Sequence, residues 1–219
     1  MSTISGSAGE SQPKGLFITF EGPDGSGKST QARLLADRLR EAGRDVFETA
    51  EPGGTSIGRE IRRILLDPAN KELTATSELL LMFAARAQNV EQAILPALDQ
   101  GKIVISDRFT DSSLAYQGAG RGLGSEVVLE LDGIACSGLV PDLTLCIDID
   151  PETGLARARG RGGTETRLEE QALEFHRKVR EAYHALAQIE PKRFKLIDGA
   201  GTVEAIAAKV WEQAAGLLP

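Results

Sequence analysis

The sequence predicts an α/β protein in which helices flank a five-stranded parallel sheet. Three observations carry this prediction. Short β-branched or apolar runs alternate with helical patterns along the chain, as in sheets that are covered on both faces. Two later runs are continuously apolar, which is typical of strands buried on both sides. The 219 residues, of which 41% are hydrophobic and 26% charged, fit a single globular domain.

The first half of the chain supplies two strands and three helices. The run LFITFE at 16–21 groups aromatic and β-branched residues and is expected to be a strand. Leucines at helical spacing predict a helix over 28–42, and VFET at 46–49 predicts the second strand. Helices are expected at 57–66 and at about 76–100. A proline inside the last helix should bend it, and the glycine that follows should end it.

The second half supplies three more strands. The continuous apolar runs at 102–107 and 143–149 predict buried strands, and FKLID at 194–198 predicts the last one. Asp150 is expected to be the N-cap of a helix, and the proline that follows it is expected to occupy the first helical position. Thr202 is expected to cap the C-terminal helix.

Two segments differ from this pattern. Residues 1–14 are rich in serine and glycine and are expected to form a disordered N-terminal tail, which leaves 15–219 as the folded domain. The stretch 157–167 holds four arginines and three glycines without hydrophobic periodicity. We expect it to be a mobile loop between two helices.

Composition and charge exclude several classes of protein. The net charge of −7 argues against a dedicated nucleic-acid binder, which would be basic. No apolar run approaches the roughly 18 residues of a membrane span, and the N-terminus lacks the features of a secretory signal. Cys136 and Cys146 form no zinc or redox motif. A reducing, cytoplasmic location is therefore expected.

A phosphate-binding motif follows the first strand. The segment from Gly22 to Ser29 reads GPDGSGKS and matches GxxxxGK[ST], in which glycines let backbone N–H groups converge on phosphate oxygens. Lys28 would reach the β- and γ-phosphates, and Ser29 would ligate Mg²⁺. The predicted architecture is therefore a three-layer P-loop NTPase fold with an Arg-rich lid. The expected ATP-binding residues are Gly22, Pro23, Asp24, Gly25, Ser26, Gly27, Lys28, Ser29 and Thr30.

Other features favour a small-molecule kinase over a GTPase or a motor ATPase. The guanine-reading NKxD motif is absent, since the nearest string, NKEL at 70–73, lacks the aspartate. Asp107 and Arg108 end the third strand, where ligands bind in parallel α/β sheets. An arginine there can hold an acceptor phosphate, and an aspartate can organise Mg²⁺ or a bound water.

Several motifs occur together in an order that resembles the bacterial thymidylate kinases. They are FEGPDGSGKST, EPGGT, the helix with FAAR, SDRFTDSSLAYQGAGRG, and PDLTLCIDI followed by an Arg-rich segment. The resemblance spans about residues 15–215. It implies an ATP:dTMP phosphotransferase that uses Mg²⁺ to make dTDP for dTTP biosynthesis. It also implies a homodimer, an expectation favoured by the apolar faces of the long helix.

The same resemblance implies a role for each acceptor residue. Asp24 would accept a hydrogen bond from the 3′-hydroxyl, and Arg62 and Arg108 would hold the phosphates. Gln117 would read the pyrimidine edge, and Tyr116 would exclude a 2′-hydroxyl. The dTMP site would comprise Asp24, Glu51, Pro52, Arg62, Met82, Phe83, Arg86, Arg108, Ser112, Ser113, Tyr116 and Gln117.

The chain departs from the family pattern at the base-stacking position. Many relatives carry a phenylalanine four residues before the arginine that faces thymine, which here is Arg86. That register places Met82 there, with Phe83 one residue later. Methionine can pack against a ring face, and a small rotation of the helix could instead present Phe83. Both alternatives remain open at this stage.

The phosphate-binding loop has no cation at its variable positions, so the resemblance assigns a catalytic arginine to the lid. The candidates are Arg157, Arg159, Arg161 and Arg167, and the glycine-interrupted part favours Arg161 and Arg167. The expected catalytic set is Asp24, Lys28, Arg108, Arg161 and Arg167. The expected metal ligands are Ser29 and Asp107.

Two rival functions remain. A kinase of a nucleoside would need a carboxylate base for its hydroxyl acceptor, whereas this acceptor side offers arginines. A non-catalytic nucleotide-binding regulator would be expected to lose Lys28, Arg108 or the lid cations, and all are present.

Overall fold

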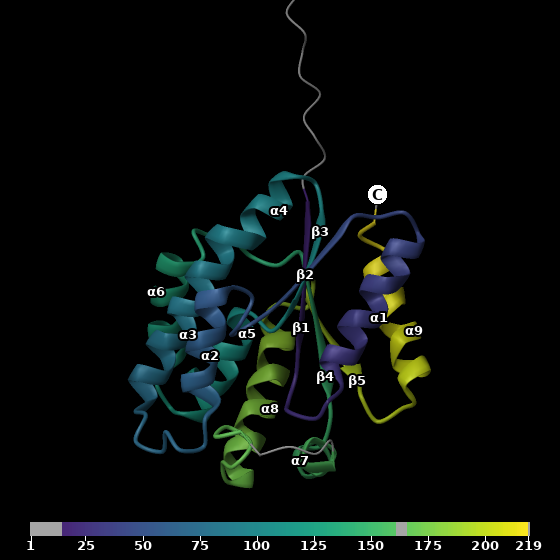
Figure 1. Cartoon of the computed structure of the whole chain (residues 1–219). Coiled ribbons are helices and arrows are strands. Elements are labelled where there is room, and N and C mark those ends of the chain that lie inside the picture. The colour runs from purple at the N-terminus through teal and green to yellow at the C-terminus, as the bar shows by residue number, and fades with distance from the viewer. Residues whose placement is uncertain (1–14, 161–165, 219) are drawn as a thin grey trace, which may run out of the picture.

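The computed structural model describes residues 15–160 and 166–218. These residues form the five-stranded parallel sheet that the sequence predicts, and its strand order is β2-β3-β1-β4-β5 (Figure 1). The strands are β1 Leu16–Glu21, β2 Val46–Ala50, β3 Ile103–Asp107, β4 Leu143–Asp148 and β5 Phe194–Asp198. The expected tail at 1–14 and the lid candidate Arg161 lie outside the described residues.

Helices cover both faces of the sheet and complete three layers (Figure 1). The helical segments are α1 Lys28–Glu41, α2 Ser56–Leu66, α3 Ala75–Asn89, η1 Val90–Ile94, α4 Leu95–Asp99, α5 Thr110–Ser113, η2 Leu114–Gly120, α6 Ser125–Ala135, α7 Pro151–Gly160, α8 Leu173–Ile189 and α9 Val203–Ala215. No described helix is both long and apolar enough to cross a membrane.

The two faces have separate cores because side chains alternate along a strand. Ile18 and Phe20 pack under α1 and α9, whereas Phe17 packs with Val104 under α3, α4 and α6. A third cluster joins η2 to α8. The three inner strands β1, β3 and β4 are therefore buried on both sides, which explains the apolar runs in the sequence.

The long helix expected at 76–100 is one continuous helical segment with a widened π-helical turn. That turn, η1, lies directly before Pro96, which occupies the first turn of α4. A proline nitrogen cannot donate, so a change of hydrogen-bond register at this point is physically reasonable.

The structure adds helices to the predicted elements and corrects one loop. Residues 110–120 and 125–135 are helical, and the sequence analysis predicts no element there. The loop expected at 157–167 is helical at its start because α7 continues to Gly160. Arg157 and Arg159 are therefore helical residues.

Candidate active site

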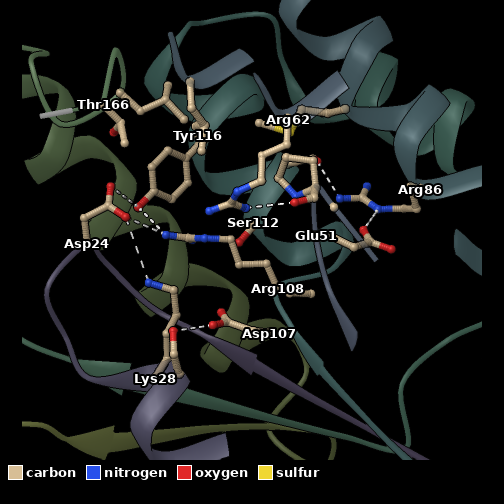
Figure 2. Close-up of a pocket in the computed structure, with 18 of the residues that line it drawn as sticks. Asp24, Lys28, Glu51, Arg62, Arg86, Asp107, Arg108, Ser112, Tyr116 and Thr166 are labelled. Atoms are coloured by element: carbon tan, nitrogen blue, oxygen red, sulfur yellow. Dashed lines mark hydrogen bonds and ion pairs between the residues drawn. The ribbon is translucent and has the colours of Figure 1, made fainter. Parts of the chain in front are cut away.

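A cavity of about 410 Å³ opens at the carboxyl edge of the sheet, beside the loop that follows β1. This cavity is the larger of two beside the loop. Figure 2 shows Asp24, Lys28 and Arg108 at one end of it and the Glu51–Arg86 pair at the other. The predicted acceptor residues that line it are Asp24, Glu51, Pro52, Arg62, Met82, Arg86, Arg108, Ser112, Ser113, Tyr116 and Gln117.

The loop between β1 and α1 has the close-packed geometry of a phosphate cradle. Gly27 has a φ of 94° and directly precedes α1, so the helix N-terminus faces the loop. Gly22 has a φ of 135°, and a Cβ there would lie 2.4 Å from the Ile147 carbonyl oxygen. Only glycine fits these two positions, which leaves backbone N–H groups and the helix end available to an anion.

Lys28 lies in this cradle and is buried. Its Nζ donates to the Pro23 carbonyl oxygen at 3.2 Å and lies 4.0 Å from Asp24 Oδ1. Burial lowers the pKa of Lys28, and the charge of Arg108 lowers it further. A bound anion would reverse both effects by compensating the charge.

Ser29 and Asp107 come together at the ends of the loop and of β3. The Ser29 hydroxyl donates to Asp107 Oδ2. Two oxygen donors beside a phosphate cradle fit Mg²⁺, which takes few protein ligands and completes its shell with phosphates and water. The described residues hold no cluster of three or more potential His, Cys, Asp or Glu ligands.

Arg108 spans the phosphate end of the larger cavity. Its backbone adopts a φ of 75°, an unfavourable conformation for a residue with a side chain. Its Nη2 donates to Asp24 Oδ1 at 2.7 Å and to the Tyr116 hydroxyl at 3.2 Å. Burial opposes the charge, but Tyr116 and Asp24 outweigh it and raise the pKa of Arg108, which therefore stays charged.

A buried carboxylate supports Arg108 from behind. Glu21 accepts from the Phe109 N–H at 2.7 Å, from the Tyr183 hydroxyl at 3.0 Å and from the Ser112 hydroxyl. Both hydroxyls also accept from Arg108 Nη1, Ser112 at 3.0 Å and Tyr183 at 3.4 Å. Burial, with the charge of Asp111 adding to it, raises the pKa of Glu21 to about 7.

Arg62 adds a further cation beside Arg108. Its Nη1 donates to the Pro52 carbonyl oxygen at 2.8 Å, and its side chain lines the cavity. Burial lowers the pKa of Arg62, and the charge of Arg108 lowers it further. Repulsion between Lys28, Arg62 and Arg108 indicates a space that is suited to a phosphate.

The opposite end of the cavity is organised by Arg86. Its Nε donates to Glu51 Oε2 at 2.6 Å, and its Nη2 donates to the Phe109 carbonyl oxygen and to Ser113 Oγ, both at 3.0 Å. Within the described part of the chain, Arg86 Nη1 is buried without a hydrogen-bond partner. A buried donor without a partner is costly, and a ligand acceptor in the cavity would satisfy it.

A smaller cavity of about 390 Å³ lies on the other side of the phosphate-binding loop. It is lined by residues of the loop, of α7 and of the turn before α9: Gly25, Ser26, Gly27, Thr30, Gln31, Arg157, Gly201, Thr202, Val203 and Ile206. Among the described side chains, Ser26 Oγ and Gln31 Oε1 are buried there without a partner. One loop thus separates two cavities, as a donor and an acceptor site require.

The family model described as "Thymidylate kinase" matches residues 20–210, which cover the phosphate-binding loop and both cavities. The chain belongs to the thymidylate kinase family.

Individual relatives support the same assignment. The chain is 53% identical to the thymidylate kinase of Pelobacter propionicus, with 91% of this chain and 93% of that protein covered. It is 52% identical to the thymidylate kinase of Thermomicrobium roseum, with 89% and 92% covered. The crystal structure of thymidylate kinase from Ehrlichia chaffeensis superposes with a TM-score of 0.76 at 34% identity, covering 93% of this chain and 99% of that one.

In this structure the predicted lid residue Arg167 is buried and lines neither cavity. Its guanidinium points away from the phosphate cradle, since Nη2 donates to buried Glu78 at 2.5 Å and Nε to the Leu65 carbonyl oxygen at 3.0 Å. Arg157 lines the smaller cavity, and its Nη1 donates to the Gly199 carbonyl oxygen at 3.2 Å. Arg161 lies outside the described residues, so its catalytic role stays a prediction.

Met82 and Phe83, the two residues considered for the base-stacking position, lie in different surroundings. Met82 lines the larger cavity, whereas Phe83 is only 3% exposed and belongs to the core under α3. The Arg86 guanidinium lies over the Phe83 ring at 4.5 Å, so the ring supports Arg86 from behind. In this structure Met82 therefore lines the cavity and Phe83 does not, and stacking of Met82 on a base stays a prediction.

Sequence reasoning missed several residues of this kinase site. Glu21, Glu78 and Tyr183 carry the hydrogen bonds that hold predicted residues, and Thr166 and Leu168 line the larger cavity. A charged residue that ends an apolar strand run, as Glu21 does, is a signal that could have found one of them. Nothing local in the sequence distinguishes the other four.

Proposed function

We propose that this enzyme transfers the γ-phosphoryl group of ATP to the 5′-phosphate of dTMP, producing dTDP and ADP with Mg²⁺ as cofactor. The observation that carries the proposal is the pairing of the two cavities across one phosphate-binding loop. The larger cavity has a cationic end, with Lys28, Arg62 and Arg108, and a base-reading end at Arg86 and Gln117. Residues 15–219 would form the single catalytic domain.

The donor would occupy the loop and the smaller cavity. Backbone N–H groups of residues 22–27 and Lys28 would hold the phosphates, and the adenine would lie beside Arg157 and the turn at 199–203. Ser29 and Asp107 would hold Mg²⁺, which when bound supplies positive charge to the reacting phosphates. These assignments follow from the cavity lining and from the two oxygen donors.

The acceptor phosphate would lie between Arg62 and Arg108. One of its oxygens forms a bond to the γ-phosphorus while the bond from that phosphorus to the ADP oxygen breaks. The acceptor is already an oxyanion, so no general base is required. Charge neutralisation and alignment by Lys28 and Arg108 therefore carry catalysis, and an arginine in this role contributes about 10³ to 10⁵ in rate.

The sugar and base would be held by neutral and charged groups further along the cavity. Asp24 and Tyr116 would meet the deoxyribose, because their side chains meet beside Arg108, where Tyr116 donates to Asp24 Oδ2 at 3.0 Å. Arg86, Ser113 and Gln117 would meet the pyrimidine edge, and Met82 its face.

An ADP-release assay with ATP and Mg²⁺ tests this function. The acceptors offered in parallel are dTMP, dUMP, dCMP, AMP, GMP and thymidine. Strong preference for dTMP supports the proposal. Preference for another acceptor would keep the phosphoryl-transfer centre and overturn the pocket assignment. ATP binding without acceptor-dependent turnover would favour a regulatory nucleotide-binding protein.

We further propose that two copies associate through α6. Val127 and Ile134 are seven residues apart on this helix and share a face, yet they are 44% and 80% exposed. Leu80 on the adjoining helix α3 is also exposed, at 51%. Apolar side chains grouped on neighbouring helices favour an interface.

We propose a cytoplasmic location, in which the nucleotides ATP and dTMP are available. Cys136 and Cys146 are buried free thiols, and burial raises the pKa of both. Inert reduced thiols are consistent with a reducing compartment.

A further inference from the structure

Glu78 is a fully buried carboxylate on α3 to which neither the sequence motifs nor the proposed reaction gives a role. It joins α3 to two other segments of the chain, which are η2 with the residue after it and the segment before α8. Gln117 Nε2 of η2 donates to Oε1 at 2.8 Å, and Arg121 Nη2, just after η2, donates to Oε2 at 2.9 Å. Arg167 donates to the same Oε2 from the segment before α8.

The charge state of Glu78 decides how Gln117 is oriented. Burial alone would raise the pKa of Glu78, but hydrogen bonds from Arg121, Gln117 and Arg167 lower it below its ordinary value. The ionised carboxylate can only accept hydrogen bonds, so it must face the amide nitrogen of Gln117. The other amide atom, Oε1, is then directed elsewhere.

The Gln117 oxygen is left for a ligand. Gln117 is buried, and it lines the larger cavity. No hydrogen-bond donor of the described residues meets its Oε1. Arg86 contributes the opposite polarity, because its Nη1 is a buried donor without a partner in the same residue set. This end of the cavity therefore offers one acceptor and one donor.

That pair of groups matches only one class of pyrimidine edge. Thymine and uracil present a donor at N3–H beside an acceptor at O4, which complements the Gln117 oxygen and the Arg86 donor. Cytosine presents an acceptor at N3 beside a 4-amino donor, so both contacts would be mismatched. A site whose buried polar groups are left unpaired rejects the wrong substrate strongly.

We propose that Glu78 is a positioning residue that fixes the polarity of the Gln117 amide, and thereby makes the acceptor site select 4-oxo over 4-amino pyrimidine monophosphates. This inference rests on the proposed function and deepens it. Glu78 also fixes one wall of the cavity, because Arg167 lies between Thr166 and Leu168, which line it.

The test compares kcat/KM for dTMP and for dCMP in the wild type and in a Glu78→Gln variant. The variant's own amide can present either a donor or an acceptor, so Gln117 is free to turn over. We expect the dTMP to dCMP ratio to fall by at least about tenfold, since the turned Gln117 amide can donate to cytosine N3, although the mismatch between Arg86 and the 4-amino group remains. An unchanged ratio, with lower activity on both substrates, would show a merely structural role and overturn the proposal.

A second variant covers the case in which Glu78→Gln does not fold. Glu78→Asp keeps the charge for Arg121 and Arg167 but withdraws the carboxylate from Gln117 by one methylene. We expect a smaller fall in the same ratio, and a folded Glu78→Asp enzyme with the wild-type ratio would overturn the proposal.

Asp111→Asn is the matched control, because Asp111 is a buried carboxylate that pairs with Arg193 at 2.7 Å and does not line the larger cavity. The dTMP to dCMP ratio of this control should equal that of the wild type even if its stability falls.

A wild type that phosphorylates dTMP and dCMP equally well would overturn the inference and leave the kinase function in place. A wild type without dTMP turnover would remove the proposed function, and the inference with it.

Discussion

Arg108 is held in a left-handed backbone conformation, with a φ of 75°, and its guanidinium is fixed by a carboxylate and three hydroxyl groups. Such strain costs on the order of 1 kcal/mol or more and persists where the surrounding structure fixes it. The hydrogen bonds of Arg108 to Asp24 and Tyr116 hold its charge at the end of the larger cavity that adjoins the phosphate-binding loop, where we propose that the two substrates meet. The strained backbone conformation therefore occurs at a residue to which we assign a catalytic role.

Replacing Arg108 with alanine should lower kcat by about 10³-fold or more, because the charge that stabilises the transferring phosphoryl group is removed. The KM for ATP should change far less, since the loop backbone and Lys28 hold the donor. Steady-state ADP release with varied ATP separates the two constants. Arg63→Ala is the control, because Arg63 is 75% exposed and pairs with Glu60 on the same helix. A variant at Arg108 with more than a tenth of the wild-type kcat would contradict this assignment.

Glu21 makes stability depend on pH. Its pKa is raised from 4.5 to about 7, so between these values the folded state binds more protons than the unfolded state. The contribution of Glu21 to the free energy of unfolding therefore falls as pH rises from about 4.5 to 7, and levels off above that.

In Glu21→Gln the side chain stays neutral at every pH. The free energy of unfolding of the variant, relative to the wild type, should rise between pH 5 and pH 8 by up to a few kcal/mol. Urea denaturation at both values measures the difference, and a Glu60→Gln variant controls for the loss of a surface carboxylate. A difference that is constant across this range, or that falls, would show that Glu21 is ionised throughout.

At the scale of elements, α7 presses directly against the phosphate-binding loop. A Cβ on Gly154 of α7 would lie 2.5 Å from the Asp24 carbonyl oxygen, and one on Gly25 would lie 1.8 Å from the Gly154 carbonyl oxygen. Backbone meets backbone here, so neither side can yield by moving a flexible side chain. The helix thereby fixes the shape of the loop.

Gly154→Ala should accordingly reduce ATP-dependent turnover, although glycine to alanine inside a helix normally stabilises it by about 0.5–1 kcal/mol. We expect a higher KM for ATP together with a lower melting temperature, measured by kinetics and thermal denaturation. Gly160→Ala on the same helix is the control, because its Cβ would meet no atom of residues 15–160 and 166–218 within 4 Å outside its own chain neighbours and helix backbone. Equal behaviour of the two variants would show that the contact between α7 and the loop is unimportant.

Local sequence pattern was sufficient for the sheet and for most of the cavity lining. The strand runs, the glycine loop and the motif at 107–117 each place their residues through the local chain path alone. Local pattern was not sufficient where a contact with a residue far away in the sequence determines the direction of a side chain. Arg167 is directed by Glu78, 89 positions away, and Phe83 differs from Met82 only in the direction of one helical step. Residues 114–120 are helical because they pack against α8 and α6, although they are small and glycine-rich.

The whole molecule separates its charges by location. The chain carries 32 acidic against 25 basic residues, yet Lys28, Arg62, Arg86 and Arg108 all line one cavity. The chain is thus acidic as a whole, while these four cations offer local positive charge to anionic ligands in the cavity. The exposed apolar side chains of α6 lie next to exposed Leu80 of α3, and this grouping is why we assign the α6 face to self-association.

Ile134→Glu should convert the proposed dimer into a monomer, because it places a charge at the centre of an apolar contact. Light scattering during size-exclusion chromatography should give twice the chain mass for the wild type and the single chain mass for the variant. Ile189→Glu is the matched control, since Ile189 is 74% exposed at the end of α8, far from α6 in the sequence. A monomeric wild type, or a dimer that survives in Ile134→Glu, would rule out this face as the interface.

Dimer formation would add a further consequence at the site, because α3 bears both Leu80 on the exposed face and Arg86 in the acceptor pocket. Loss of the dimer should therefore raise the KM for dTMP, with the KM for ATP unchanged.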